Sequence, residues 1–249
     1  MRILLSSFTL FLSLFCAFNV QAATIDLAQW VFNIDGTVSE SGFYPVGVEP
    51  LPSGVTGSLD TNGFGSFSTQ VSGAGDHNIT LMLDYEIDET TNTFFNEYGS
   101  TGGSLAVGGS LAALQSWEID EPGYLFGDIY DNTLDATLDN SNNVPNGLND
   151  DVAFALGWSF TLGVDEIATI DFSISDILDT SGFYLAQHDA ETGLGYDELS
   201  SIYFWSDLSI SGNTPIGVPE PGTALLLGIG VLGVLLTSPR RKHLKTELK

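Results

Sequence analysis

Apolar and polar residues alternate along most of this chain, and a period of two residues is typical of a β-strand with one buried face. In residues 152–162 every second side chain is large and apolar, and the residues between are Ala, Gly, Ser or Thr. Trp30, Phe32 and Ile34 alternate with polar or smaller residues in the same way. Helical periodicity is nearly absent from the middle of the chain, where only residues 104–114 could form a short helix.

Short turns rich in Gly and Asn separate these segments. Asn62-Gly63 lies between two of them and is a strong signal for a β-hairpin. A brief connection at 163–165 predicts a second hairpin over residues 152–174, and a last strand is expected at 202–210. We therefore expect an all-β fold, an antiparallel β-sandwich with a jelly roll as the preferred variant.

Charge is distributed very unevenly. The chain has 32 Asp and Glu residues but only six Lys and Arg, and none of these bases lies between Ile3 and Pro239. Of the acidic residues, only Glu247 lies beyond that segment. The segment therefore forms no Lys or Arg salt bridge of its own, and it repels nucleic acid, which is not expected as a partner. Dissolved cations, above all Ca²⁺, are the expected counterions, although an acidic surface also serves solubility.

The N-terminus has the pattern of a secretory signal peptide. A basic Arg2, an apolar stretch and a small-residue site ending at Ala22 predict that residues 1–22 are removed. The only cysteine, Cys16, lies in that segment, so no disulfide or thiolate metal site is expected in the mature chain. Residues 23–214 are then expected to form one acidic ectodomain.

The C-terminus combines a proline-containing linker, an apolar run and a basic tail. The linker is 215–221, and the run at 222–238 is at the short end for a membrane-spanning helix. The basic tail, 239–249, favours a cytoplasmic C-terminus and places the ectodomain on the other side of the membrane. An ordinary tail anchor is the alternative interpretation.

This arrangement resembles the PEP-CTERM sorting signal of Gram-negative bacteria. The matching residues are Pro219, Glu220 and Pro221, followed after the apolar run by Arg240, Arg241 and Lys242. The resemblance implies an exosortase in the inner membrane that recognises the Pro-Glu-Pro element, cleaves near it and passes the protein to the outer surface. It implies a precursor anchored transiently in the inner membrane with its ectodomain in the periplasm, and a product at the cell surface or outside the cell.

The ectodomain itself is similar to a recurring domain of PEP-CTERM proteins, and the likeness implies no particular activity. It is carried by residues 92–97, 116–124, 150–152, 155–158 and 182–185.

Carboxylates gather on the polar faces of two expected strands. Alternation places Asp84, Glu86 and Asp88 on one face about 6.8 Å apart, and Glu118 and Asp120 together on another strand. If the strands were neighbours, these five residues would form a Ca²⁺ site, because close like charges need a cation to stay ionised. Asn96 or Glu97 would assist such a site. The alternative is that these are only the solvent-facing sides of two strands.

A long polar loop is expected at 131–151. Within it, residues 139–150 have acidic and amide side chains at several ligand positions of a twelve-residue calcium loop. Val144 stands where that loop requires glycine, so the pattern fails as an EF-hand and leaves only a less regular Ca²⁺ loop.

We expect a non-enzymatic exported protein with a structural or adhesive role, assisted by Ca²⁺. A carbohydrate-binding module is the first alternative, because tyrosines beside turns could stack on sugars of an extracellular polysaccharide. A polysaccharide hydrolase with Glu86 and Glu118 as its carboxylate pair is the second. The sequence contains neither the GxSxG nor the HExxH motif. The tyrosines are Tyr44, Tyr98, Tyr124, Tyr130 and Tyr196.

Overall fold

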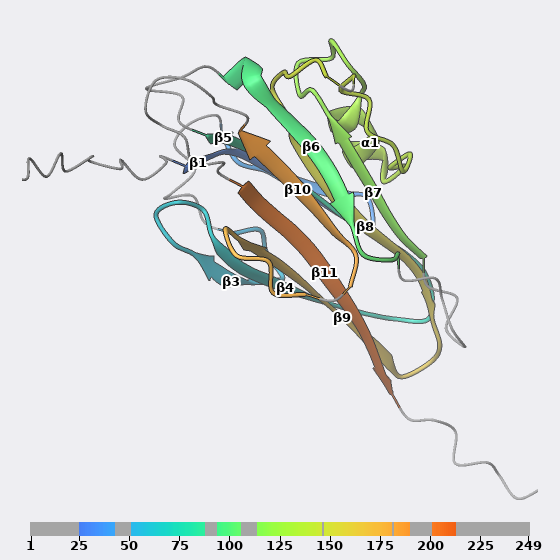
Figure 1. Ribbon diagram of the computed structural model, residues 1–249. Coiled ribbons are helices and arrows are strands. Elements are labelled where there is room, and N and C mark those ends of the chain that lie inside the picture. The colour runs from blue at the N-terminus through green and yellow to red at the C-terminus, as the bar shows by residue number, and fades with distance from the viewer. Residues whose placement is uncertain are drawn as a thin grey trace, which may run out of the picture. The chain divides into compact units, whose positions relative to one another are not determined.

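The chain forms two antiparallel β-sheets that face each other, with one helix on the outer side of the first sheet (Figure 1). The computed structural model describes residues 25–42, 51–87, 94–105, 114–145, 147–180, 182–189 and 201–212. The five-stranded sheet has the order β2-β1-β5-β8-β7, and the six-stranded sheet has the order β3-β4-β9-β11-β10-β6.

The strands of the five-stranded sheet are β1 (Ile25–Ile34), β2 (Thr37–Glu40), β5 (Gly75–Ile87), β7 (Leu114–Asp120) and β8 (Ala153–Leu162). Those of the six-stranded sheet are β3 (Val55–Leu59), β4 (Gly65–Ser72), β6 (Glu97–Gly102), β9 (Glu166–Ser175), β10 (Tyr184–Asp189) and β11 (Ser201–Gly212). A short 3₁₀ helix, η1 (Phe94–Asn96), precedes β6, and α1 (Ile129–Asp135) follows β7.

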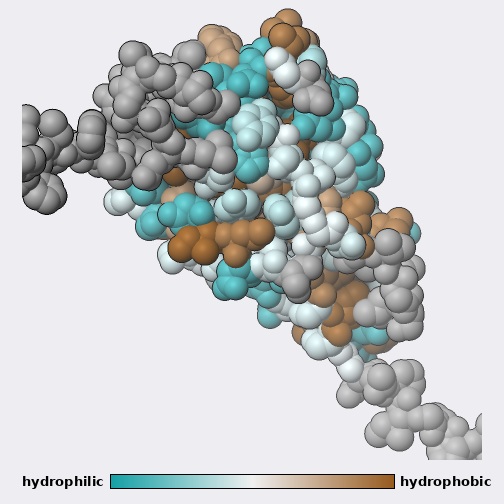
Figure 2. All heavy atoms as spheres, in the orientation of Figure 1, coloured by the Kyte–Doolittle hydropathy of each residue, from teal (hydrophilic) through white to brown (hydrophobic). Residues whose placement is uncertain are grey.

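The hydrophobic core lies between the sheets and consists of the apolar residues of the alternating runs. Trp30 and Phe32 of β1 point into it as predicted, at 3% and 0% exposure. Phe154 of β8 stacks on Phe204 of β11 with ring centroids 5.3 Å apart, so this pair joins the two sheets. On the face shown in Figure 2, hydrophilic and intermediate residues predominate between separate brown patches.

The Asn62-Gly63 hairpin is confirmed. It joins β3 to β4, with Leu59 opposite Gly65. Gly63 has a φ of +80°, and a Cβ atom there would lie 2.8 Å from the Cβ of Leu27, so the turn requires glycine. The carboxylate of Asp60 accepts hydrogen bonds from the amides of Asn62 and Phe64 and fixes the turn.

The hairpin predicted over 152–174 is wrong in its pairing, although both strands are present. β8 pairs with β5 and β7, whereas β9 pairs with β4 in the other sheet. The connection at 163–165 therefore crosses from one sheet to the other. Alternation identifies the buried face of each strand but not its hydrogen-bonding partner, and two facing sheets satisfy it as well as one hairpin does.

The polar loop predicted at 131–151 contains a helix, so that prediction is corrected in part. α1 packs on the outer face of the five-stranded sheet, where Ile129 joins a small apolar cluster with Val31, Met82 and Ala153. The side chain of Thr80 donates a hydrogen bond of 3.0 Å to the carbonyl of Thr133 at the end of the helix.

The segment after α1 runs along the outer edges of both sheets. Beside β7, the amide of Ile119 donates to the carbonyl of Ser141, and the amide of Asn143 donates to the carbonyl of Ile119. Beside β6, the backbones of Glu97 and Asp150 exchange two hydrogen bonds of 3.1 and 2.9 Å. Residues 140–150 therefore close one side of the sandwich.

The antiparallel sandwich is confirmed. Because the described residues form more strands than the eight of a jelly roll, the fold is an antiparallel sandwich without that more specific label. The signal peptide 1–22, the possible helix at 104–114 and the sorting signal with its apolar run 222–238 lie wholly or mainly outside the described residues. In the part of the chain that is described, no helix is long and apolar enough to cross a membrane.

Two buried carboxylate clusters as candidate functional sites

The structure divides the four described members of the predicted group of five carboxylates between two places. β8 lies between β5 and β7, so Asp84 and Glu86 on β5 are separated from Glu118 and Asp120 on β7. Asp88 lies outside the described residues. The single five-carboxylate group expected from neighbouring strands is therefore not formed, and metal binding stays a prediction.

These side chains are on the outer face of the sheet, as alternation predicted, but they are buried rather than solvated. Asp84 is 2% exposed, and Glu118 is fully buried. α1 lies against β5, β7 and β8 on this side and covers part of the face. An outer face that is itself covered gives carboxylates the low-dielectric surroundings of a core.

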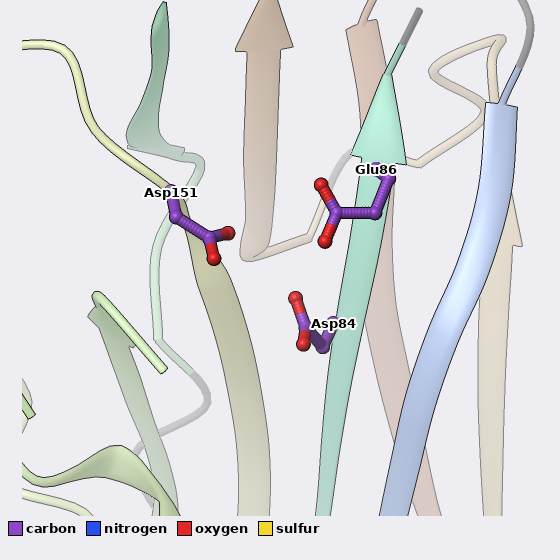
Figure 3. A group of neighbouring side chains, drawn as sticks. All are labelled: Asp84, Glu86 and Asp151. Carbon is purple, nitrogen blue, oxygen red and sulfur yellow. The ribbon is translucent and has the colours of Figure 1, made fainter. Parts of the chain in front are cut away.

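We call Asp84, Glu86 and Asp151 the β5 cluster. β5 and β8 are antiparallel with Asp84 opposite Ala153, so extending this register by two residues places Asp151 opposite Glu86. Each residue offers one carboxylate oxygen, and these oxygens lie within 4.8 Å of one another. Figure 3 shows the three carboxylates converging on one point, two from β5 and one from the chain that leads into β8.

Two oxygens of the β5 cluster lack a hydrogen-bond donor. One oxygen of Asp84 and one of Asp151, Oδ1 in both, are buried without a hydrogen-bond partner. Burial raises the pKa of Asp84 well above its ordinary value, and the nearby charges of Asp151, Glu86 and Glu121 raise it further. Burial, followed by the charge of Glu86, raises the pKa of Asp151 to about 8.

We call Glu118, Asp120 and Asp128 the β7 cluster, and its oxygens also lie within 4.8 Å of one another. In contrast to the β5 cluster, donors surround it. Glu118 accepts hydrogen bonds from the side chain of Asn132 on α1 at 2.9 Å and from the amide of Asp139 at 3.1 Å.

Asp120 is held in the same manner. One of its oxygens accepts from the amide of Asp128 at 3.0 Å, and the other accepts from the amide and the side chain of Asn143. A Cβ atom at Gly127, whose φ is +106°, would lie 2.0 Å from the carboxylate of Asp120. The chain between β7 and α1 is thus folded closely around this carboxylate.

The carboxyls of Glu118 and Asp120 also lie close together, so a proton held by one of them would offset their mutual repulsion. Burial raises the pKa of Glu118 to about 8, and a hydrogen bond with Asp120 acts in the same direction. Burial likewise raises the pKa of Asp120, while its hydrogen bonds from Glu118, Asp128 and Asn143 lower it. In the β7 cluster, hydrogen-bond donors and the raised pKa of Glu118, which favours a bound proton, therefore both reduce the repulsion between the carboxylates.

Asp151 was not among the carboxylates predicted for a site. The signal available was its place two residues before Ala153, since a strand that continues backwards by two residues keeps the same face. Asn96 and Glu97, the proposed helpers, take other roles: Asn96 donates to Asp189, and buried Glu97 accepts from the backbone amide of Ile87.

Residues at ligand positions of the possible calcium loop, 139–150, make hydrogen bonds to neighbouring protein groups. Asp139 accepts hydrogen bonds from the amide and the hydroxyl of Ser141, Asn143 donates to Asp120, and Asp150 bridges to Glu97. These contacts support the turn and its attachment to β7 and β6.

Comparison with known proteins identifies one segment of the chain. The PEP-CTERM protein-sorting motif matches residues 217–241. Neither a curated protein nor a solved structure matches the chain. The motif is that of an exported protein which an exosortase recognises and processes at the membrane. The sandwich upstream of it is therefore described by its geometry alone.

Proposed function

We propose that this chain is a non-enzymatic structural or adhesive protein of the cell envelope or extracellular matrix, with Ca²⁺ assisting its ectodomain. The sorting motif at 217–241 is the observation that carries the proposal, because it assigns the chain to exosortase processing. In the precursor, residues 222–238 span the inner membrane, with the ectodomain in the periplasm and the basic tail in the cytoplasm. Processing then delivers the ectodomain to the cell surface or the medium.

The chemistry of the Pro-Glu-Pro element supports recognition by a protease-like enzyme. Pro219 and Pro221 have fixed φ angles and no amide hydrogen, so the chain before the apolar run stays extended. Glu220 then offers a carboxylate near the membrane surface for recognition, and Arg240 to Lys242 hold the other end in the cytoplasm.

Buried carboxylates support a role without catalysis. A hydrolase with Glu86 and Glu118 as its carboxylate pair needs both groups open to a sugar and placed across one bond. Here they belong to strands separated by β8, and Glu118 is fully buried with both oxygens engaged. Turnover of a polysaccharide that Glu118→Gln abolishes would establish the hydrolase instead.

Carbohydrate binding is the second candidate, favoured by one pocket. A depression of about 700 Å³ lies beside β6 and is lined in part by Tyr98, Ser100, Asn142 and Leu148. Tyr98 is half-buried and stacks on His188 with ring centroids 4.8 Å apart, and an aromatic ring that lines a pocket is a surface on which a sugar can stack. Binding to a glycan array that Tyr98→Ala removes would favour this function over the adhesive one.

The sorting proposal is tested by mass spectrometry of both ends of the exported protein from its native host. We expect a new N-terminus after residue 22 and loss of residues 222–249. Glu220→Gln should leave the C-terminus intact, whereas the matched control Glu247→Gln, outside the motif, should be processed normally. Exported protein that retains residues 240–249 would make the segment a plain membrane anchor.

A further inference from the structure

We propose that the β5 cluster of Asp84, Glu86 and Asp151 is a Ca²⁺ site that fastens β5 to the start of β8. The inference deepens the Ca²⁺-assisted part of the proposed function and rests on it only for export into a medium that contains Ca²⁺. It replaces the five-residue set expected from the sequence with three residues on adjacent chain segments.

The first argument is the match between the oxygens and the ion. Three carboxylates each present an oxygen, and these oxygens lie within 4.8 Å of one another. Ligands on opposite sides of a Ca²⁺ ion are about 4.6–5.2 Å apart, since each lies about 2.3–2.6 Å from the metal. Mg²⁺ dehydrates reluctantly and usually keeps several waters, with only one or two protein carboxylates as ligands, so a buried group of three carboxylates favours Ca²⁺.

The second argument is the orphaned oxygens. Asp84 is 2% exposed and Asp151 is 9% exposed, yet Oδ1 of each has no hydrogen-bond partner. A buried carboxylate oxygen without a partner is costly, and native proteins normally supply a donor or a cation. Both residues point toward the third carboxylate, that of Glu86, so one ion can serve the group (Figure 3).

The third argument is that the part of the chain that contains the β5 cluster has no Lys or Arg to neutralise it. No Lys or Arg occurs between Ile3 and Pro239. The histidines of the described residues are engaged elsewhere: His77 bonds to Asp35 and the carbonyl of Gly73, and His188 bonds to Ser100 and Ser201. A dissolved cation is the remaining source of positive charge for the β5 cluster.

The position of the site gives the ion a structural role. Asp151 follows Asp150, whose backbone is bonded to Glu97 at the start of β6 in the opposite sheet. An ion held between β5 and Asp151 therefore also steadies the point at which the two sheets are joined. Loss of the ion leaves three close carboxylates that must be neutralised by protons.

The test uses the full chain in a mild detergent, stripped with a chelator and then titrated with CaCl₂ alone. We expect about one Ca²⁺ per chain by calorimetry, and a rise in Tm of about 5–10 °C at a hundredfold excess over the dissociation constant. Asp84→Asn and Asp151→Asn should each remove most of the rise. Asp171→Asn, an exposed residue of β9 in the other sheet, should retain it in full.

Asp84→Asn and Asp151→Asn are both included because either variant is enough for the test if the other fails to fold. An unchanged Tm of the stripped wild-type chain on adding CaCl₂, or an equal rise in both cluster variants, would overturn the site. A larger rise with MgCl₂ than with CaCl₂ would overturn the choice of ion. The readouts are separable from sorting: failure to bind Ca²⁺ leaves C-terminal processing unchanged, and failure of processing leaves Ca²⁺ binding by the purified chain unchanged.

Discussion

The β5 and β7 clusters each contain three carboxylates at close range, but they differ in what offsets the repulsion between them. Both bring three carboxylates together on the outer side of one sheet, with oxygens within 4.8 Å of one another, although Asp128 of the β7 cluster is exposed. The β7 cluster is surrounded by amides of α1 and its flanking turns, whereas the β5 cluster has orphaned oxygens on Asp84 and Asp151. The count of acidic residues therefore does not reveal a metal site, and the supply of donors distinguishes the two.

The largest effect on stability should come from removing the carboxylate of Asp120 from the donor-rich β7 cluster. Asp120→Ala leaves the amides of Asp128 and Asn143 without their acceptor, and we expect a loss of about 4 kcal/mol in the free energy of unfolding, or about 10 °C in Tm. Urea unfolding measures it. Asp171→Ala, exposed on β9, should change stability by about 0.5 kcal/mol or less. Similar losses in the two variants would mean that the donors around Asp120 contribute nothing special.

The next effect is pH dependence. The pKa of Glu118 is raised from its ordinary 4.5 to about 8, so the folded state binds this proton more tightly than the unfolded state does. Its contribution is fully present below pH 4.5 and is lost as the pH rises toward 8. In metal-free buffer, stability of the wild type should fall relative to Glu118→Gln by about 1 kcal/mol per pH unit between pH 5 and 8.

Both proteins contain the β5 cluster, so the difference between their urea midpoints, measured at pH 5, 6.5 and 8, isolates Glu118 and its partner Asp120. Parallel curves across that range would show that no proton is held between the two carboxyls.

The smallest effect is the most direct comparison of the clusters. In the presence of a chelator, Asp84→Asn removes one of three close carboxyls that must otherwise repel its neighbours or bind a proton, and it should raise the free energy of unfolding by about 1 kcal/mol. Asp120→Asn, the same change in the β7 cluster, places an NH₂ group against donors and should lower it. Thermal melts of the two variants in chelator measure both effects. Effects of the same sign would mean that the two clusters do not differ in their supply of hydrogen-bond donors.

The sequence predicted the faces of the strands well and their partners poorly. Leu81, Leu83 and Tyr85 point into the core and Asp84 points away from it, as the period of two requires. The same period says nothing about which strand lies alongside, and so β8 and β9 were placed in one hairpin although the chain crosses between sheets at 163–165.

The sequence also did not predict that α1 covers the outer face of the five-stranded sheet. α1 is short and rich in Asp and Asn, which favour turns over helix interiors, and its N-cap residue Asp128 makes no side-chain capping bond. Small Ala153 and Ala155 on β8 leave room for it, but their size has this meaning only once the helix is known to pack there. The burial of Glu118, whose carboxylate accepts a hydrogen bond from Asn132 of α1, follows from that tertiary packing, so local sequence could not predict it.

The segment at 140–150 also determines how copies of this domain can meet. An outermost strand with open backbone groups is a template on which another molecule can add a strand, and crowded secreted proteins are especially exposed to such aggregation. Here the backbone of β7 at Ile119 and that of β6 at Glu97 are both already bonded to this one segment. Strand addition is thereby hindered at these two positions, so an assembly formed through this part of the domain would depend on side chains.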